Sequence, residues 1–305
     1  MHRYALEHRV SHADVDLLGE VKVAALLGLL EQAAVEASWE CGFDPRWYTE
    51  RQRVWIIRRT RLERFQPVGG GDRLRVATHV LDWRRARSLR AYVVERMGND
   101  GAASPVARAT TDWVYCDMTS GRPVSVPEDM RRAFSGDDDV TLPRARALPE
   151  SGLGEPVVLP FVVHPSLLDH VTHVNNAAYA AMLEDGAFAL FASGGWPVAR
   201  MLEQGGALRM ARVDLEYLDD AVAGDDLRIQ SWPVAHGADA AAASPRSARG
   251  PSEDARALAC DDRGAPHAVR LLQNIARADG SRILRAASDW VWRRRPTILG
   301  GVPEA

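Results

Sequence analysis

The strongest constraint in the sequence is an internal repeat. When the chain is shifted by 153 positions, many residues of its first half fall on identical residues of its second half without a gap. A fixed offset that includes rarer residue types indicates two copies of one structural unit and argues against a chance match of apolar patterns. The identical pairs are Asp16 and Asp169, Val21 and Val174, Ala24-Ala25 and Ala177-Ala178, Leu30-Glu31 and Leu183-Glu184, Arg59 and Arg212, Leu62-Glu63 and Leu215-Glu216, Gly71 and Gly224, and Leu74-Arg75 and Leu227-Arg228.

The repeat divides the 305 residues into two domains joined by a linker. Asp112-Trp113-Val114 matches Asp289-Trp290-Val291 at an offset of 177, so the second copy contains additional residues. We assign them to 235–266, which is rich in Ala, Ser, Gly and Pro and has no apolar period, and we predict a mobile insertion there. The predicted units are an N-terminal module at 1–134, a linker at 135–155 and a C-terminal module at 156–305.

Each copy shows the same order of predicted elements, namely a short strand, one long helix and four strands. This order is typical of a hot-dog module, an antiparallel sheet curled around one central helix. A single module leaves a sheet edge exposed, so pairing of two modules is expected. We therefore predict an α+β double hot-dog, with two antiparallel sheets each wrapped around a long central helix. The predicted elements are strands 4–10, 54–57, 74–80, 89–94 and 109–115 with a helix at 23–37, and strands 157–163, 213–218, 227–232, 269–275 and 283–292 with a helix at 178–192.

The composition argues against several classes of function. The net charge of −3 gives no electrostatic reason to expect nucleic acid or an anionic membrane as a partner. Cys41, Cys116 and Cys260 lie far apart, so neither a disulfide framework nor a zinc cluster is expected. The longest apolar run, 21–30, is too short to span a membrane. We expect a soluble, cytoplasmic protein that needs no metal and no cofactor.

One stretch of the second copy contains a recognisable motif. Residues 169–179 read Asp-His-Val-Thr-His-Val-Asn-Asn-Ala-Ala-Tyr. They resemble the Asp-x-x-x-His-Val-Asn-Asn-x-x-Tyr motif of acyl-ACP thioesterases of the plant and bacterial fatty-acid type, which are tandem hot dogs of about this size. The resemblance extends to Leu215-Glu216-Tyr217. It implies that Asp169 and His173 are active-site residues and that Asp220, which follows the Leu-Glu-Tyr stretch, is an acidic partner.

The resemblance also marks candidate substrate-binding residues and one departure. Asn175, Asn176 and Tyr179 belong to the motif, and Asp16 occupies the position of Asp169 in the first copy. The family has an Asn two residues before the catalytic His, whereas this chain has Val171. The way in which the substrate is positioned should therefore differ.

The residue types fit the chemistry of thioester hydrolysis, which needs an activated water or a carboxylate nucleophile and donors for an oxyanion. Asp169 supplies the base or nucleophile, and His173 orients water or transfers a proton. The helix that begins near Asn176 presents unpaired N–H groups, and the acyl chain is expected in an apolar tunnel beside the helix. Three plainer interpretations stay open: the Asn pair as a helix cap, Asp169 as a turn residue and Asp220 as a solvated charge.

The first copy has a related but altered stretch. Asp14 to Val21 resembles the Asp-x-Asp-x-x-Gly-x-Val stretch of single-module thioesterases, but Glu20 stands at the position of His173. Lys22-Val23 replaces the Asn pair. This copy is therefore either a scaffold, which we favour, or a second site that uses Asp16 and Glu20.

The predicted function is hydrolysis of an acyl thioester, with release of a carboxylic (fatty) acid from acyl-ACP or acyl-CoA. The acyl carrier protein is then a candidate partner, and a homodimer of the fused chain is left open. Two alternatives use the same fold: an acyl-thioester hydratase or dehydratase, and a module that binds an acyl group or a carrier protein without catalysis.

Overall fold

The computed structural model describes residues 3–134, 147–169, 171–234, 258–260 and 266–295. Every predicted strand and helix is present, most of them longer than predicted, and the short elements α2, α3, α5 and β9 come in addition. The first half contains β1 (Tyr4–Arg9), α1 (Val23–Glu40), α2 (Pro45–Arg51), β2 (Arg53–Arg64), β3 (Arg73–Arg84), β4 (Arg87–Met97), β5 (Ala103–Asp117) and α3 (Glu128–Phe134). The second half contains β6 (Val157–Val162), α4 (Ala178–Ser193), α5 (Val198–Glu203), β7 (Gly206–Tyr217), β8 (Asp226–Pro233), β9 (Leu258–Cys260), β10 (Pro266–Arg277) and β11 (Arg282–Arg294).

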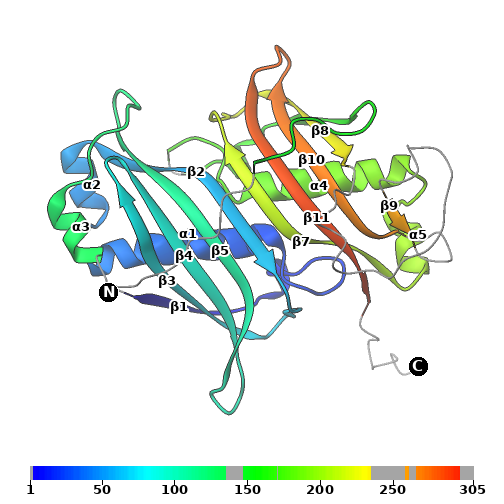
Figure 1. Ribbon diagram of the computed structural model, residues 1–305, viewed down its shortest axis with the longest axis horizontal. Coiled ribbons are helices and arrows are strands. Elements are labelled where there is room, and N and C mark those ends of the chain that lie inside the picture. The colour runs from blue at the N-terminus through cyan, green and yellow to red at the C-terminus, as the bar shows by residue number, and fades with distance from the viewer. Residues whose placement is uncertain (1–2, 135–146, 170, 235–257, 261–265, 296–305) are drawn as a thin grey trace.

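The strands form one continuous antiparallel sheet (Figure 1). Its order is β1-β3-β4-β5-β2-β7-β11-β10-β8-β6, and β9 pairs with β10. The prediction of two separate sheets is therefore wrong, because Arg59–Glu63 of β2 pairs with Arg212–Glu216 of β7 and joins the halves. In two separate modules, the backbone N–H and C=O groups along these edges of β2 and β7 would be exposed. The pairing of the two strands satisfies them.

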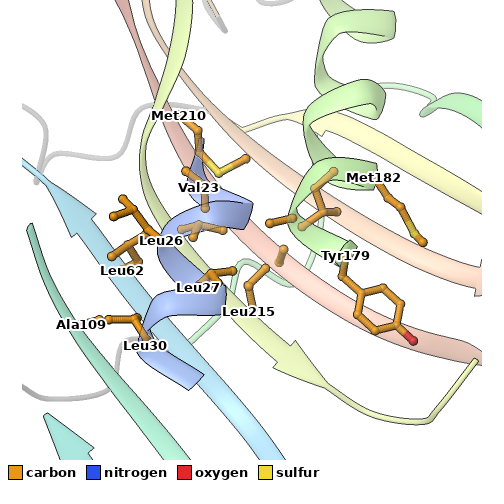
Figure 2. Packing of buried hydrophobic residues seen from close by; sticks show 14 of the residues in the cluster. Val23, Leu26, Leu27, Leu30, Leu62, Ala109, Tyr179, Met182, Met210 and Leu215 are labelled. Carbon is orange, nitrogen blue, oxygen red and sulfur yellow. The ribbon is translucent and has the colours of Figure 1, made fainter. Parts of the chain in front are cut away.

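Each helix lies across its own half of the sheet. α1 contacts β1 and β3, α4 contacts β6 and β8, and the two helices also contact each other. The buried apolar side chains of both helices and of the strands in both halves form one shared core. None of the described helices is long and apolar enough to cross a membrane. Figure 2 shows this core where the halves meet, with Val23, Leu26, Leu27 and Leu30 of α1 beside Leu62 of β2, Met210 and Leu215 of β7, and Tyr179 and Met182 of α4.

The repeat is visible in the backbone hydrogen bonds, while the predicted domain boundaries stay a prediction. Of the predicted linker, residues 147–155 are described and form no helix or strand. The predicted insertion at 235–266 lies mostly outside the described residues, and its described part includes β9 and the first residue of β10. Equivalent hydrogen bonds join Val10 N to Asp72 O and Val163 N to Asp225 O, Val21 N to Val68 O and Val174 N to Ala221 O, and Gly71 N to Val10 O and Gly224 N to Val163 O.

Ion pairs across the β2–β7 contact hold the halves in register. Asp214 accepts two hydrogen bonds from Arg59, at 2.6 and 2.7 Å, and one from Nε of Arg61 at 3.1 Å. These side chains are largely buried, so their attraction is screened less by solvent than a surface pair. The neighbouring pair of Arg212 and Glu63, at 3.0 Å, is about half exposed.

A second charged group lies deeper between the halves. The carboxylate of Glu20 forms an ion pair with Arg209 of β7 and lies 3.5 Å from Arg64 of β2. All three residues are buried. Glu184 of α4 lies near Asp16 and Arg64, and burial raises the pKa of Glu184 to about 7, with Asp16 acting in the same direction.

The ion pairs between β2 and β7 give a first prediction. Asp214→Ala leaves Arg59 and Arg61 close together without their carboxylate, so we expect it to lower the free energy of unfolding by about 2–3 kcal/mol. Glu63→Ala is the matched control on the same pair of strands, and should cost less than about 1 kcal/mol because its pair with Arg212 is exposed. Urea unfolding of both variants measures the difference. Equal losses would contradict a special role for Asp214.

Glu184 gives a prediction on pH. Its folded pKa of about 7 lies above the ordinary value of 4.5, so the native state binds more protons than the unfolded state between these values. The wild type should therefore lose stability as the pH rises from about 4.5 to about 7, by roughly 3 kcal/mol in total, since one pKa unit corresponds to about 1.4 kcal/mol. In Glu184→Gln this loss should disappear. Parallel stability curves of wild type and variant across that range would contradict the assignment.

Candidate active site

The motif residues Asp169 and His173 lie at the two ends of one tight turn. The Asp169 N–H donates to the His173 carbonyl at 2.9 Å, and the Thr172 N–H donates to the Asp169 carbonyl at 3.1 Å. The Val171 N–H donates to Oδ1 of Asp169 at 2.9 Å, which fixes the carboxylate. Thr172 has φ +68, a left-handed conformation that costs a β-branched residue about 1–3 kcal/mol. The turn thus holds both candidate side chains at the expense of local strain.

Asp220 reaches the other end of this turn. Its Oδ2 lies 3.5 Å from Nδ1 of His173, and both side chains are partly open to solvent. At this distance the carboxylate can orient the imidazole ring. The structure therefore brings together Asp169, His173 and Asp220, the three residues predicted to act in catalysis.

The start of α4 lies directly after the turn. Asn175 accepts the Ala177 N–H through its side chain at 2.9 Å and the Ala178 N–H through its carbonyl at 2.9 Å, so it caps the helix. These two amides are therefore occupied. Within the described part of the chain, the N–H of Asn176 makes no hydrogen bond. It remains as a donor at the positive end of the helix dipole.

A groove of about 1170 Å³ extends from the turn into the first half of the molecule. The second half contributes Asp169, His173, Asn176 and Tyr179 together with residues 217–220. Most of the remaining wall comes from α1, the first residues of β2, the β3–β4 hairpin and the end of β5. The helix beside the groove is therefore chiefly α1. Several apolar side chains that line it are exposed, namely Val35, Trp39, Ile56, Met118, Val171 and Leu218.

Two tyrosines and a glutamate lie near the start of α4. Tyr179 and Tyr217 are buried with their rings 6.0 Å apart, and burial raises the pKa of both phenols. The Tyr217 hydroxyl donates to the Asn176 carbonyl at 3.3 Å. Glu31 of α1 lines a small pocket together with Asn176 and Ala177. The pocket places a carboxylate of the first half opposite the helix start of the second half.

The equivalent turn of the first half is closed. Asp16 Oδ1 accepts the N–H groups of Leu18 and Glu20, at 2.8 and 3.0 Å, and Asp16 is not among the described residues that line the groove. Burial raises the pKa of Asp16. Glu20, at the position of His173, is paired with Arg64 and Arg209. The first half thus has the turn, but its carboxylate accepts two backbone amides and the residue at the position of His173 is engaged in ion pairs.

The motif at residues 169–179 does not by itself predict several features of the site. Tyr217 was recognised only as part of the resemblance, and the groove wall from the first half was not predicted, because a motif within one copy does not report contacts with the other. The position of Glu31 follows from the repeat, since it is the counterpart of Glu184. Among the described residues, no group of three or more His, Cys, Asp or Glu side chains is arranged to hold a metal ion. His170 lies outside the described residues.

Comparisons with known proteins agree with the fold. A model of the thioesterase-like superfamily matches residues 10–134. A structure described as an oleoyl thioesterase from Lactobacillus plantarum is 16% identical, with a TM-score of 0.71 over 95% of this chain and 96% of that chain. The 12:0-ACP thioesterase from Umbellularia californica is 16% identical, with a TM-score of 0.67 over 96% and 98%. An acyl-ACP thioesterase from Bacteroides thetaiotaomicron is 15% identical, with a TM-score of 0.66 over 95% and 98%.

No curated protein sequence matches the chain significantly. The solved structures cover nearly the whole chain at low identity and therefore establish the fold. The chain thus shares the tandem hot-dog fold of these structures, and residues 10–134 match the model of the thioesterase-like superfamily.

Proposed function

We propose that the protein hydrolyses acyl thioesters at the turn of Asp169 and His173. The observation that supports this most directly is the groove, because it joins a carboxylate, an imidazole and a helix start to a long apolar wall. An acyl thioester has the matching parts: a reactive carbonyl at one end and an apolar chain at the other. The superfamily match and the acyl-ACP thioesterases of the same fold agree with this substrate class.

In the proposed mechanism, the carbonyl of the thioester lies at the start of α4. The Asn176 N–H and the helix dipole stabilise the oxyanion that forms on attack. The Asp169 carboxylate acts as base toward the attacking water, or itself attacks as the nucleophile and forms a mixed anhydride that water then hydrolyses. His173, oriented by Asp220, donates the proton that the departing thiolate needs. Carboxylic acid and free thiol leave as the products.

The acyl chain then follows the groove along α1 into the first half. The predicted roles of Asn175 and Asp16 in substrate binding receive no support from their positions, because Asn175 caps α4 and Asp16 lies at the closed turn. Tyr179 and Asn176 line the groove and remain candidates. Whether the thiol carrier is coenzyme A or an acyl carrier protein, and whether the protein works in the cytoplasm, stay predictions.

Replacing Asp169 tests the proposal. Asp169→Asn keeps the Oδ1 acceptor for the Val171 N–H, so the turn should fold, but it removes the charge that activates water. We expect thiol release from saturated acyl-CoA or acyl-ACP to fall about 10²- to 10⁴-fold, with an unchanged urea midpoint. Saturated substrates also exclude hydratase activity, which releases no thiol. Retained turnover in the variant would reject the assignment.

The repeat provides a matched control in the same chain. Asp16→Asn changes the same residue type in the equivalent turn. Thiol release should persist, because Glu20, which stands at the position of His173, is held by two arginines. A loss as large as that of Asp169→Asn, without unfolding, would show that the first half contains a working site.

A further inference from the structure

The groove contains a buried arginine that the proposed chemistry does not use. Arg90 of β4 is only 6% exposed and is one of the residues that line the groove. Like its neighbours Ser88 and Tyr92, it belongs to the buried face of its strand. A guanidinium stays charged at this depth, and a buried arginine normally faces a carboxylate.

No carboxylate of the described residues forms an ion pair with Arg90. Its Nη1 lies 3.4 Å from the Thr78 hydroxyl, and its guanidinium lies over the ring of Phe134 at 5.3 Å. Burial lowers the pKa of the Arg90 guanidinium, and the nearby phenols of Tyr92 and Tyr48 and the thiol of Cys41 act in the opposite direction. These neutral contacts leave most of the planar donor fork unused.

The surroundings of Arg90 are aromatic and contain a further unused donor. Trp83 and Phe134 line the groove together with Arg90, and their rings are 6.3 Å apart. Nε1 of Trp83 is buried and has no hydrogen-bond partner within the described part of the chain. The Trp83 indole N–H and the remaining N–H groups of Arg90 fit the end of a ligand that brings oxygen atoms.

The sheet register places Arg90 at a distance that an acyl chain can bridge. Arg90 pairs with Thr111 of β5, and Thr111 pairs with Thr60 of β2. Thr60 and Asn176 line the same small pocket at the start of α4. Two strand spacings, about 10 Å, therefore separate Arg90 from the strand beside the reactive end.

We propose that the acyl group of the substrate carries an anion at its far end, most simply a carboxylate, and that Arg90 binds it. The substrate class is then the monothioester of a medium-length dicarboxylic acid. A carboxylate matches the planar fork of the guanidinium and restores the missing counter-charge. An unsubstituted hydrocarbon end would leave Arg90 buried and unpaired. The inference rests on the proposed function for the reactive end, but the binding of the anion does not depend on catalysis.

Two measurements test the inference. In the first, adipyl-, suberyl- and sebacyl-CoA are compared with hexanoyl-, octanoyl- and decanoyl-CoA in thiol release. We expect the wild type to prefer the carboxylated member of at least one pair by about tenfold or more in kcat/KM, because a buried polar group discriminates strongly against a ligand that leaves it unpaired. Arg90→Met should remove this preference, and Arg90→Lys should retain part of it, since it keeps the charge without the fork.

The second measurement follows binding of free suberate and octanoate by tryptophan fluorescence, since Trp83 and Arg90 line the same groove and both contact Phe134. Suberate should bind more tightly to the wild type, and Arg90→Met should abolish the difference. Arg75→Met removes an exposed arginine of β3 and controls for net charge. If no thioester is hydrolysed, the proposed function fails while the binding comparison still decides this inference.

Three results would overturn the inference. They are equal or stronger hydrolysis of all the unsubstituted acyl-CoAs, equal binding of octanoate and suberate, and an unchanged preference in a folded Arg90→Met. If that variant does not fold, the wild-type comparisons and Arg90→Lys decide the question.

Discussion

The antiparallel pairing of β2 with β7 is the contact on which the site depends. It covers Arg59–Glu63 only, and β2 extends beyond it as Arg53–Arg58, whereas β7 ends at Tyr217. The two strands therefore part at the same place where the chain of the second half continues into Leu218–Asp220. The space beside the extended end of β2 becomes the groove, and the turn of Asp169 lies at its edge. A longer pairing would have closed this space with a hydrogen-bonded strand.

The two halves share one design but differ in what fills the equivalent places. At the closed turn, Arg209, Arg64 and Glu20 form a buried charged group. Their counterparts in the repeat at the open turn are Ile56, Tyr217 and His173. At the closed turn, the long side chains of the two arginines and the glutamate fill the space and form ion pairs with one another. At the open turn, the corresponding three residues line the groove. The same backbone thus carries a buried group of ion pairs in one half and a candidate site in the other.

The sequence was sufficient for what local pattern determines. Helical spacing of apolar residues predicted α1, and a fixed offset predicted that the second half would repeat its order. The motif predicted Asp169 and His173 as neighbours because one turn contains both. The single sheet could not be predicted, since strand pairing between copies is a tertiary choice that leaves no period in the sequence. Arg90 was missed for a related reason: one arginine in an alternating strand is unremarkable until its burial is known.

Val171 shows why a departure from a family motif need not disturb a site. Its backbone N–H fixes the Asp169 carboxylate, and any residue other than proline supplies that donor. The turn therefore does not need the family's Asn for its own geometry. What the side chain changes is the surface beside the carboxylate, because Val171 is 40% exposed and extends the apolar wall formed by Leu218 and Ile56. An amide there would add a polar contact at the reactive end, whereas valine leaves recognition to the helix start and to groups deeper in the groove.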